Sequence, residues 1–510
     1  MLKKRFMRKI VKKLFLIITI ALFLPGESNP FAQDPFFKAA NQTVADFRDK
    51  AEKLALWCEE NDLPEQAAFT RGELLPSAAD KIYVPTFPKD VISEDVPEDA
   101  PDLVKKWNAD WWKIKKDYAE KLQSMLGRTV QKKRGVLAMQ MAVAALHADP
   151  NNEKLRNILG LQKYKNQWRT GWEIKKLKQG NVEHDLFGWI PAKHVSRYEN
   201  GERYYNKKWI SIEEESRIRS NINAGWRIES EHYTIITNHS LEEGVRLSRN
   251  LEDFYRTWKQ VFVRFYASDD EFGAMFQGRP SDRQPHLKIV YYKDQQNYID
   301  SNVKAVPDIA RTGGFFDFDK QCCFFFKSND PDIHSTVYHE ATHQLFTLAC
   351  PNPGRSEGDW NFWITEAVAV YMESFHRENG FCVLGGNDQN RLKMARYRLF
   401  VTKFYVPFEI LTLLSLEQFQ AFPHLGIGLP SDWDITMLYS QVGGMGHFLM
   451  HSDDGQYREA FVEYLNNYYS GMNTPLTLFE LIQKTPDQLN QEYVTFLKNA
   501  SDDDQPDDEL

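Results

Sequence analysis

The spacing of hydrophobic residues predicts a long helix between residues 240 and 266. Hydrophobic side chains recur there every three or four positions, which is typical of a helix with one buried face. Ser240 and Glu243 have the residue types and the spacing of a capping box at its start. The recurring residues are Val245, Leu247, Leu251, Phe254, Trp258, Val261, Phe262 and Phe265.

Short hydrophobic runs on both sides of this helix predict β-strands. Residues 231–238 and 286–292 each form one such run, and residues 313–326 form two, with a tight turn near Asp319-Lys320. The remainder of the chain is mostly helical in pattern. Strands followed by helices indicate an α+β domain, which we place at residues 226–499.

The part of the chain before this domain is predicted to be mainly helical. Residues 34–133 mix helical patterns with a Pro- and acid-rich stretch at 85–102, which we interpret as a linker or surface wrap. Residues 134–176 predict two short helices around the turn Asp149-Pro150-Asn151. This pair resembles one tetratricopeptide-like unit. Because such units need about three copies to bury a core, an ordinary helical hairpin is favoured.

A small β-rich segment at residues 185–212 completes the region 134–225. Asn200-Gly201 has the residue types of a β-hairpin turn, so we expect a hairpin there. Adjacent Cys322 and Cys323 lie in a predicted strand, where their side chains point to opposite faces as packing residues. With only five cysteines in the chain, a disulfide scaffold is excluded.

The two ends of the chain predict export and an acidic tail. Residues 1–13 are rich in Lys and Arg, and an apolar run of eleven residues follows at 14–24. This is the layout of a secretory signal peptide over residues 1–33. Spanning a bilayer needs about 20 apolar residues, more than this run contains, so a cleaved signal peptide is favoured and an uncleaved membrane anchor is the alternative. No transmembrane helix is expected in the mature chain. We expect an exported protein, in the periplasm or cell envelope or secreted, that ends in an acidic tail at 500–510.

The charge balance limits the class of partner. The chain carries a net charge of −8, and removal of residues 1–33 would leave about −14. Nucleic-acid binding is therefore not expected, because it requires clustered Lys and Arg. Since hydrophobic residues make up 42% of the chain, it is expected to fold around a core rather than to be disordered.

A group of metal-ligand residues lies directly after the predicted strand hairpin. His339 and His343 are four residues apart in a helical pattern, so their imidazoles share one helix face and point at one metal ion. Glu340 lies beside the first histidine, where it can reach a metal-bound water as general base. A catalytic zinc normally has three protein ligands. Glu366, on the next predicted helix, is the candidate third ligand, and Glu373 on the same face is expected to orient a ligand histidine.

These motifs resemble those of a known group of enzymes. His-Glu-x-x-His with a Glu on a second helix is the signature of the gluzincin zinc metallopeptidases. The segment 363–373 is similar to the Trp-Leu-x-Glu-Gly-x-Ala-x-Tyr-x-Glu helix of the alanyl-aminopeptidase family and its peptidase-MA-like relatives, although Ala367 replaces the usual Gly. The matching residues are Trp363, Glu366, Ala369, Tyr371 and Glu373. The whole chain resembles an exported bacterial family of unknown function that carries this signature.

The resemblance implies a gluzincin-like catalytic domain, with one zinc ion bound by His339, His343 and Glu366 and with Glu340 as the base. It also implies a tyrosine for the oxyanion, for which Tyr439 is the candidate, although the Lys of the family's Tyr-x-Lys-Gly motif is absent. The motif that anchors a substrate amino terminus is missing too, so endo- and exopeptidase action stay open. His447 and His451 form a second pair four residues apart, but no acidic third ligand accompanies them, and we interpret them as structural.

The sequence therefore favours an exported zinc-dependent peptidase that hydrolyses peptide or protein substrates. The alternative is a cell-envelope binding protein on an inactive peptidase-like fold. In either case the N-terminal helical region is a candidate docking surface for a protein partner. The intact Glu340 favours the enzyme, since inactive relatives usually lose the base or a metal ligand.

Overall fold

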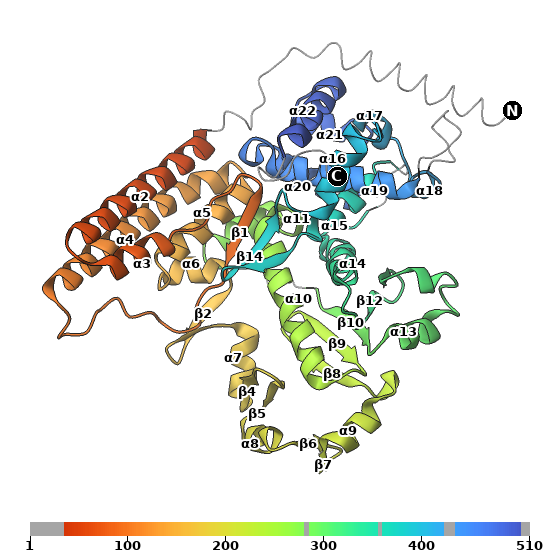
Figure 1. The fold of residues 1–510 in the computed structure, drawn as a ribbon, viewed down its shortest axis with the longest axis horizontal. Coiled ribbons are helices and arrows are strands. Elements are labelled where there is room, and N and C mark those ends of the chain that lie inside the picture. The colour runs from red at the N-terminus through yellow and green to blue at the C-terminus, as the bar shows by residue number, and fades with distance from the viewer. Residues whose placement is uncertain (1–34, 280–284, 355–359, 423–433, 501–510) are drawn as a thin grey trace.

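The computed structural model describes residues 35–279, 285–354, 360–422 and 434–500. Helices and strands are both present, and the predicted α+β class is confirmed (Figure 1). The predicted signal peptide, and the predicted acidic tail from residue 501 onward, lie outside the described residues. Within the described part of the chain, no helix has both the length and the hydrophobicity to cross a membrane.

A five-stranded mixed sheet lies at the centre of the region 226–326. The strands follow the order β11-β12-β10-β9-β8, in which β9, β10 and β12 are parallel and the two outer strands are antiparallel to their neighbours. The bounds are β8 Trp226–Glu229, β9 Tyr233–Thr237, β10 Leu287–Tyr292, β11 Gly314–Asp317 and β12 Cys322–Phe326. All the strands predicted between residues 231 and 326 are therefore present, and β11 is an edge strand.

Alternate side chains of this sheet enter two different cores. Ile289, Cys323 and Phe325 pack on one face with helices α10 (Leu241–Val261) and α14 (Pro331–Ala349). Cys322 and Phe324 pack on the other face, in a smaller cluster with α13 (Gln295–Asn302). The predicted opposite orientation of the two adjacent cysteines is confirmed, and all five cysteines are buried.

Helix α10 follows the predicted pattern but ends earlier than expected. The Ser240 hydroxyl accepts a hydrogen bond from the Glu243 N–H at 3.1 Å, so Ser240 is the N-cap. At Phe262 the backbone leaves the helical conformation, and a separate helix, α11 (Val263–Tyr266), follows. The prediction of a single helix through residue 266 is therefore wrong, because its last turn is a separate helix. Aromatic side chains on both pieces face the core and produced the continuous pattern.

The C-terminal part is a group of helices packed on α14 and on α15 (Trp363–Met372), shown in cyan and blue in Figure 1. Helix α19 (Ile435–His451) lies directly against α15. A Cβ at Gly446 would lie 2.5 Å from the Ala367 carbonyl oxygen, so only glycine allows this approach. The other helices here are α16 Asn390–Phe400, α17 Phe408–Leu411, α18 Leu416–Gln420, α20 Arg458–Tyr469, α21 Thr477–Ile482 and α22 Pro486–Asn499. Helix α12 (Asp269–Met275) packs instead against α4 of the N-terminal region, Asp102–Gln131.

The N-terminal region contributes long helices and one strand to the rest of the molecule. Helices α2 (Pro35–Glu60) and α4 (Asp102–Gln131) run side by side at the left of Figure 1. Strand β1 (Lys81–Pro85) pairs with β14 (Phe381–Gly385), which joins a segment before the predicted linker to one 300 residues later. The further elements are α3 Pro64–Gly72, α5 Gly135–Ala148, α6 Glu153–Ile158 and β13 His376–Glu378. Residues 86–101 contain no helix, as predicted for a linker or wrap.

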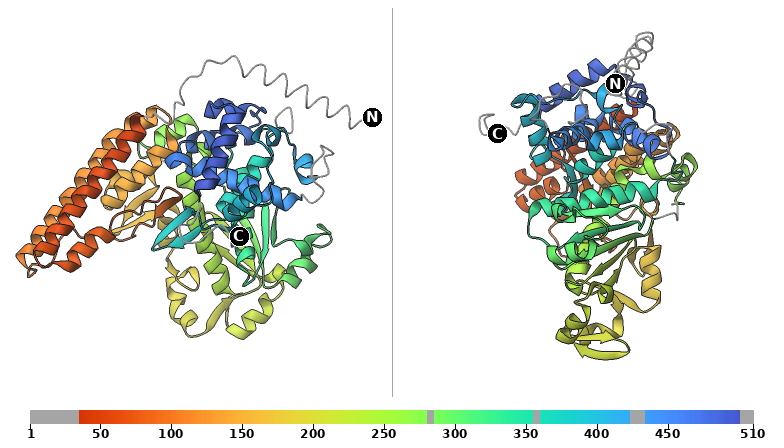
Figure 2. Two further views of the ribbon diagram at one scale, coloured as in Figure 1. Left: turned by 45° about the horizontal axis from the view of Figure 1, so that its top comes forward. Right: turned by 90° about the vertical axis from the view of Figure 1, so that its right-hand side faces the viewer.

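Three successive β-hairpin–helix units fill residues 161–219, which the sequence analysis did not recognise as a repeat. Each unit has a tryptophan at the second position of its second strand: Trp168, Trp189 and Trp209. The units are β2 Leu161–Tyr164, β3 Gln167–Thr170 and α7 Gly171–Lys178; β4 Asn181–His184, β5 Gly188–Pro191 and α8 Val195–Glu199; β6 Glu202–Tyr205, β7 Lys208–Ser211 and α9 Ile212–Arg219. Helices α7 and α8 each contact the hairpin of the next unit. Both views of Figure 2 show this array, in yellow, at the end of the molecule opposite the blue helices.

Two predictions in this region are wrong. Residues 161–170 were expected to be helical but form a hairpin, whose turn residues Lys165 and Asn166 both have positive φ. Asn200-Gly201 was expected to be a hairpin turn but ends helix α8, where Gly201 has a φ of +84°. Gly with positive φ suits both a hairpin turn and a helix C-terminus, so the residue type alone did not distinguish them. The nearby hairpin turns instead at Asn206-Lys207.

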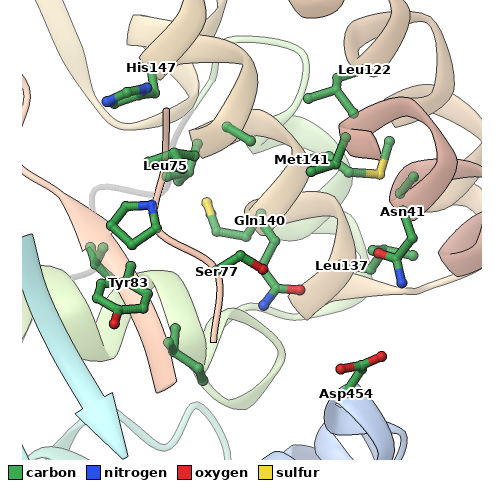
Figure 3. A pocket seen from close by; sticks show the side chains of 18 of the residues that line it. Asn41, Leu75, Ser77, Tyr83, Leu122, Leu137, Gln140, Met141, His147 and Asp454 are labelled. Atoms are coloured by element: carbon green, nitrogen blue, oxygen red, sulfur yellow. The ribbon is translucent and has the colours of Figure 1, made fainter. Parts of the chain in front are cut away.

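A cavity of about 510 Å³ lies among the N-terminal helices, β1 and the segment before it. Figure 3 shows Leu75 and Ser77, from the segment after α3, passing between Tyr83 of β1 and Gln140 and Met141 of α5. Asp454, from the C-terminal helical part, closes another side. The N-terminal region thus meets both the strands and the C-terminal helices around this cavity.

Candidate metal centre

Helices α14 and α15 bring the three predicted ligands together. His339 and His343 lie one turn apart on α14, and Glu366 lies on the first turn of α15, with its side chain almost fully buried. The nitrogen Nε2 of His343 is 3.2 Å from Nε2 of His339. The Glu366 carboxylate oxygens lie 3.4 Å from the first imidazole and 3.7 Å from the second.

These separations fit one small ion held by all three side chains. Atoms bound at 2.0–2.2 Å to a tetrahedral ion lie about 3.3–3.6 Å from one another. The three measured distances, 3.2, 3.4 and 3.7 Å, fall around this range. Among the described residues, these three are the one group of His, Cys, Asp and Glu with such converging ligand atoms.

The carboxylates around this centre favour a positive charge there. Burial alone would lower the pKa of His339, but Glu366, Glu373 and Glu340 outweigh it and raise that pKa to about 10. Burial lowers the pKa of His343, and the neighbouring His339 charge lowers it further. Burial would raise the pKa of Glu366, yet the two histidines hold it below the usual range. The chain therefore places an anionic carboxylate and two imidazoles around one point, and a divalent cation fits that donor set.

Glu373 and Arg391 hold the first histidine in place. Glu373 Oε1 lies 2.8 Å from Nδ1 of His339, which leaves Nε2 directed at Glu366 and His343. The Arg391 guanidinium, from α16, donates to both oxygens of Glu373, at 2.8 and 3.3 Å. The sequence analysis expected Glu373 in this position. It missed Arg391, because no motif links the two residues across the β13–β14 hairpin.

Glu340 is half-buried and is oriented by the edge strand. Its Oε2 accepts a hydrogen bond from the backbone N–H of Phe316 on β11 at 3.0 Å. The Phe316 N–H must therefore point away from β12, towards α14. Because backbone groups alternate along a strand, those of Gly314 point the same way. The outer edge of β11 thus runs beside the carboxylate that was predicted to be the base.

Tyr439 lies on α19 within the electrostatic reach of the same group. It is partly buried and packs edge-on against Phe419, with 5.6 Å between the ring centres. Burial raises the pKa of its hydroxyl, and the charges of Glu366 and Glu340 raise it further. The hydroxyl is therefore a neutral donor at pH 7. Gly443 and Gly446, on the same helix, allow α19 to approach α15.

The second histidine pair does not form a comparable group. His451 Nε2 lies 3.0 Å from the Tyr371 hydroxyl, and the His447 ring packs against the Tyr371 ring. Burial lowers the pKa of His447 to about 4, so it is neutral at pH 7. No carboxylate within the described part of the chain joins the two imidazoles to complete a metal-binding group. This arrangement agrees with the structural interpretation.

Comparison of the chain with the models of known protein families gives no match, and comparison with curated proteins gives none either.

Proposed function

We propose that the chain is a zinc-dependent metallopeptidase of the gluzincin type. The observation that supports this most strongly is the convergence of His339, His343 and Glu366 to within 3.2–3.7 Å of one another. Two histidines and a carboxylate are the protein ligands of one common class of catalytic zinc site, which keeps a fourth position for water. In this proposal, His339, His343 and Glu366 hold the zinc ion.

Bound zinc would lower the pKa of water towards about 7 and polarise a substrate carbonyl. Glu340 accepts the proton of the attacking water and delivers it to the leaving amine. The Phe316 N–H fixes one oxygen of Glu340 at 3.0 Å, so the other oxygen is free for this transfer. The Tyr439 hydroxyl donates to the oxyanion that develops on the substrate.

The substrate in this proposal is an extended peptide or protein segment. The open edge of β11 offers backbone hydrogen bonds next to Glu340, and peptides pair with such edges as an added strand. In this proposal the long amphipathic helices α2 and α4 of the N-terminal region are a docking surface for a protein partner. Residues 1–33 are proposed to direct export to the periplasm, the cell envelope or the exterior.

A direct test is digestion of a broad peptide library by the purified chain, with and without a zinc chelator. Cleavage that chelation abolishes and that added zinc restores would support the proposal. A chain that binds one zinc ion with good affinity but cleaves nothing would contradict it. That result would favour the alternative, a cell-envelope binding protein on an inactive peptidase-like fold.

A further inference from the structure

A second large cavity lies on the side of α10 away from the metal centre. Its volume is about 740 Å³, within the range of about 300–1,000 Å³ that is usual for small-molecule sites. Its walls come from α6, the first two hairpin–helix units, the segment after β1, the end of β8, and α10. None of the residues assigned to the metal centre lines it.

Arg156, from α6, is a fully buried cation in the wall of this cavity. Its exposed fraction is 0%, and its Nε donates to the Pro150 carbonyl oxygen at 2.7 Å. Its two terminal nitrogens, Nη1 and Nη2, have no hydrogen-bond partner among the described residues. Burial lowers the pKa of the guanidinium to about 10, so it is charged at pH 7.

An unpaired buried charge is costly, and the local chain compensates it only in part. The aromatic rings of Phe87 and Trp168 lie 5.5 and 5.2 Å from the guanidinium. Cation–π contacts with two rings recover less than the penalty for burying a charge without an anion. The cavity of Figure 3 differs in this respect. Its two buried or half-buried arginines, Arg48 and Arg458, each donate to a backbone carbonyl through their terminal nitrogens.

Other unpartnered polar atoms belong to the same wall. The indole Nε1 of Trp168 is buried without an acceptor, next to Arg156. Gln260 Oε1 and His232 Nε2, also in residues that line this cavity, are buried without partners. Native interiors satisfy nearly all buried polar groups, so a group of unpartnered atoms around one cavity supports a ligand there.

We propose that this cavity binds a small carboxylate with an apolar body, whose carboxylate pairs with Arg156. The planar fork of a guanidinium matches a carboxylate in two parallel hydrogen bonds. The Trp168 N–H is a further donor beside it. The rings of Trp172, Trp189 and Tyr255 line the same cavity and offer a surface for the apolar body of the ligand.

Entry of the ligand requires a small local movement. Nη1 and Nη2 are closed to solvent in the ligand-free chain, so an aromatic ring beside them must move for a carboxylate to reach them. Phe87 is the ring best placed to move, because residues 86–89 belong to no helix or strand. Trp168, in contrast, is held by a strand and by the hydrogen bond from its backbone N–H to the Lys89 carbonyl oxygen at 2.6 Å.

The test is calorimetric titration with 3-phenylpropionate and with its neutral amide, 3-phenylpropionamide. We expect the wild-type chain to bind the carboxylate at least tenfold more tightly than the amide. Arg156→Gln should abolish this preference and Arg156→Lys should weaken it, because Lys keeps the charge without the fork. Lys175→Gln, which removes an exposed cation on α7, should change nothing.

Two further results would overturn the inference. The first is a wild-type chain that binds neither probe, or both equally. The second is carboxylate binding that survives in Arg156→Gln but is lost in His343→Ala, since the probe would then be bound at the metal centre. If Arg156→Gln does not fold, Trp168→Phe is the second variant, which keeps a smaller aromatic ring beside Arg156 and removes the indole N–H. It should weaken carboxylate binding several-fold, and unchanged binding would contradict the assigned site.

Discussion

Glu373 Oε1 lies 2.8 Å from Nδ1 of His339, and this contact sets which nitrogen of the imidazole faces the other two ligand residues. A carboxylate hydrogen-bonded to Nδ1 fixes the tautomer of a ligand histidine and increases its basicity. Arg391 in turn fixes Glu373, so three helices cooperate in the position of one ligand atom.

Arg391→Gln is expected to weaken zinc binding about tenfold, because Glu373 would lose the group that holds its carboxylate. Competition with a zinc chelator measures the change. Arg391→Lys keeps one charge but not the paired hydrogen bonds, so its affinity should lie between those of the wild type and of Arg391→Gln. Equal affinity in all three proteins would show that Arg391 does not position Glu373.

Glu340→Gln is expected to keep zinc and to lower kcat/KM by about a thousandfold. Gln still accepts the hydrogen bond from the Phe316 N–H, but it cannot take a proton from water, and general base catalysis is worth about 10²–10⁴. Cleavage of a peptide found in the library digest gives the rate, and metal analysis gives the zinc content. Turnover near that of the wild type would disprove the assigned base.

Tyr439→Phe is expected to lower kcat by about a hundredfold without loss of zinc, since one oxyanion donor is typically worth about 2.7–4 kcal/mol. Because burial keeps the hydroxyl protonated, the loss should be the same at pH 6 and pH 8. Steady-state kinetics on one peptide measures both values. An unchanged kcat would identify Tyr439 as a packing residue.

Gly446→Ala is expected to destabilise the chain by about 1–3 kcal/mol, because the new Cβ would lie 2.5 Å from the Ala367 carbonyl oxygen and force α19 away from α15. Gly127→Ala is the matched control, in a helix where nothing lies within 4 Å of the added atom. It should stabilise α4 by about 0.5–1 kcal/mol. Chemical denaturation compares the two, and a neutral Gly446→Ala would argue against the close helix contact.

Glu459→Gln is expected to make stability less dependent on pH. Burial raises the pKa of Glu459 to about 7, against the opposing effect of the Leu137 and Val136 N–H groups. A raised carboxyl pKa stabilises the protonated folded chain, an effect fully present below pH 4.5 and lost as the pH rises through 7. The free energy of unfolding of the wild type should therefore fall by up to about 3 kcal/mol over this range, and that of the variant should not. Denaturation at pH 5 and pH 8 measures it, and equal slopes for both proteins would contradict the assignment.

The sequence predicted the centre of the molecule better than its periphery. The strands from residue 231 to residue 326 and the two ligand helices follow from local hydrophobic patterns, and the three ligand residues lie together as expected. Glu373 could be placed as well, because it shares a helix face with Glu366. The pairing of β1 with β14, the contact of Arg391 with Glu373 and the orientation of Glu340 by Phe316 all join segments distant in sequence, which local patterns do not encode.

The array of three hairpin–helix units was missed for a different reason. The units share little beyond a tryptophan and a turn, and in the first unit the residues of the hairpin also fit a helical pattern. In the fold, Lys165 and Asn166 both have positive φ and form the turn of a hairpin, which a helix does not allow. Lys is not a residue that indicates such a turn.

If His339, His343 and Glu366 share one metal ion, anomalous X-ray scattering will locate that ion between them. Crystals grown with one equivalent of zinc, measured on either side of the zinc absorption edge, are expected to show one strong peak. That peak should lie about 2.0–2.2 Å from Nε2 of both histidines and from a Glu366 oxygen. A peak elsewhere in the chain, or no peak between these three side chains, would contradict the account.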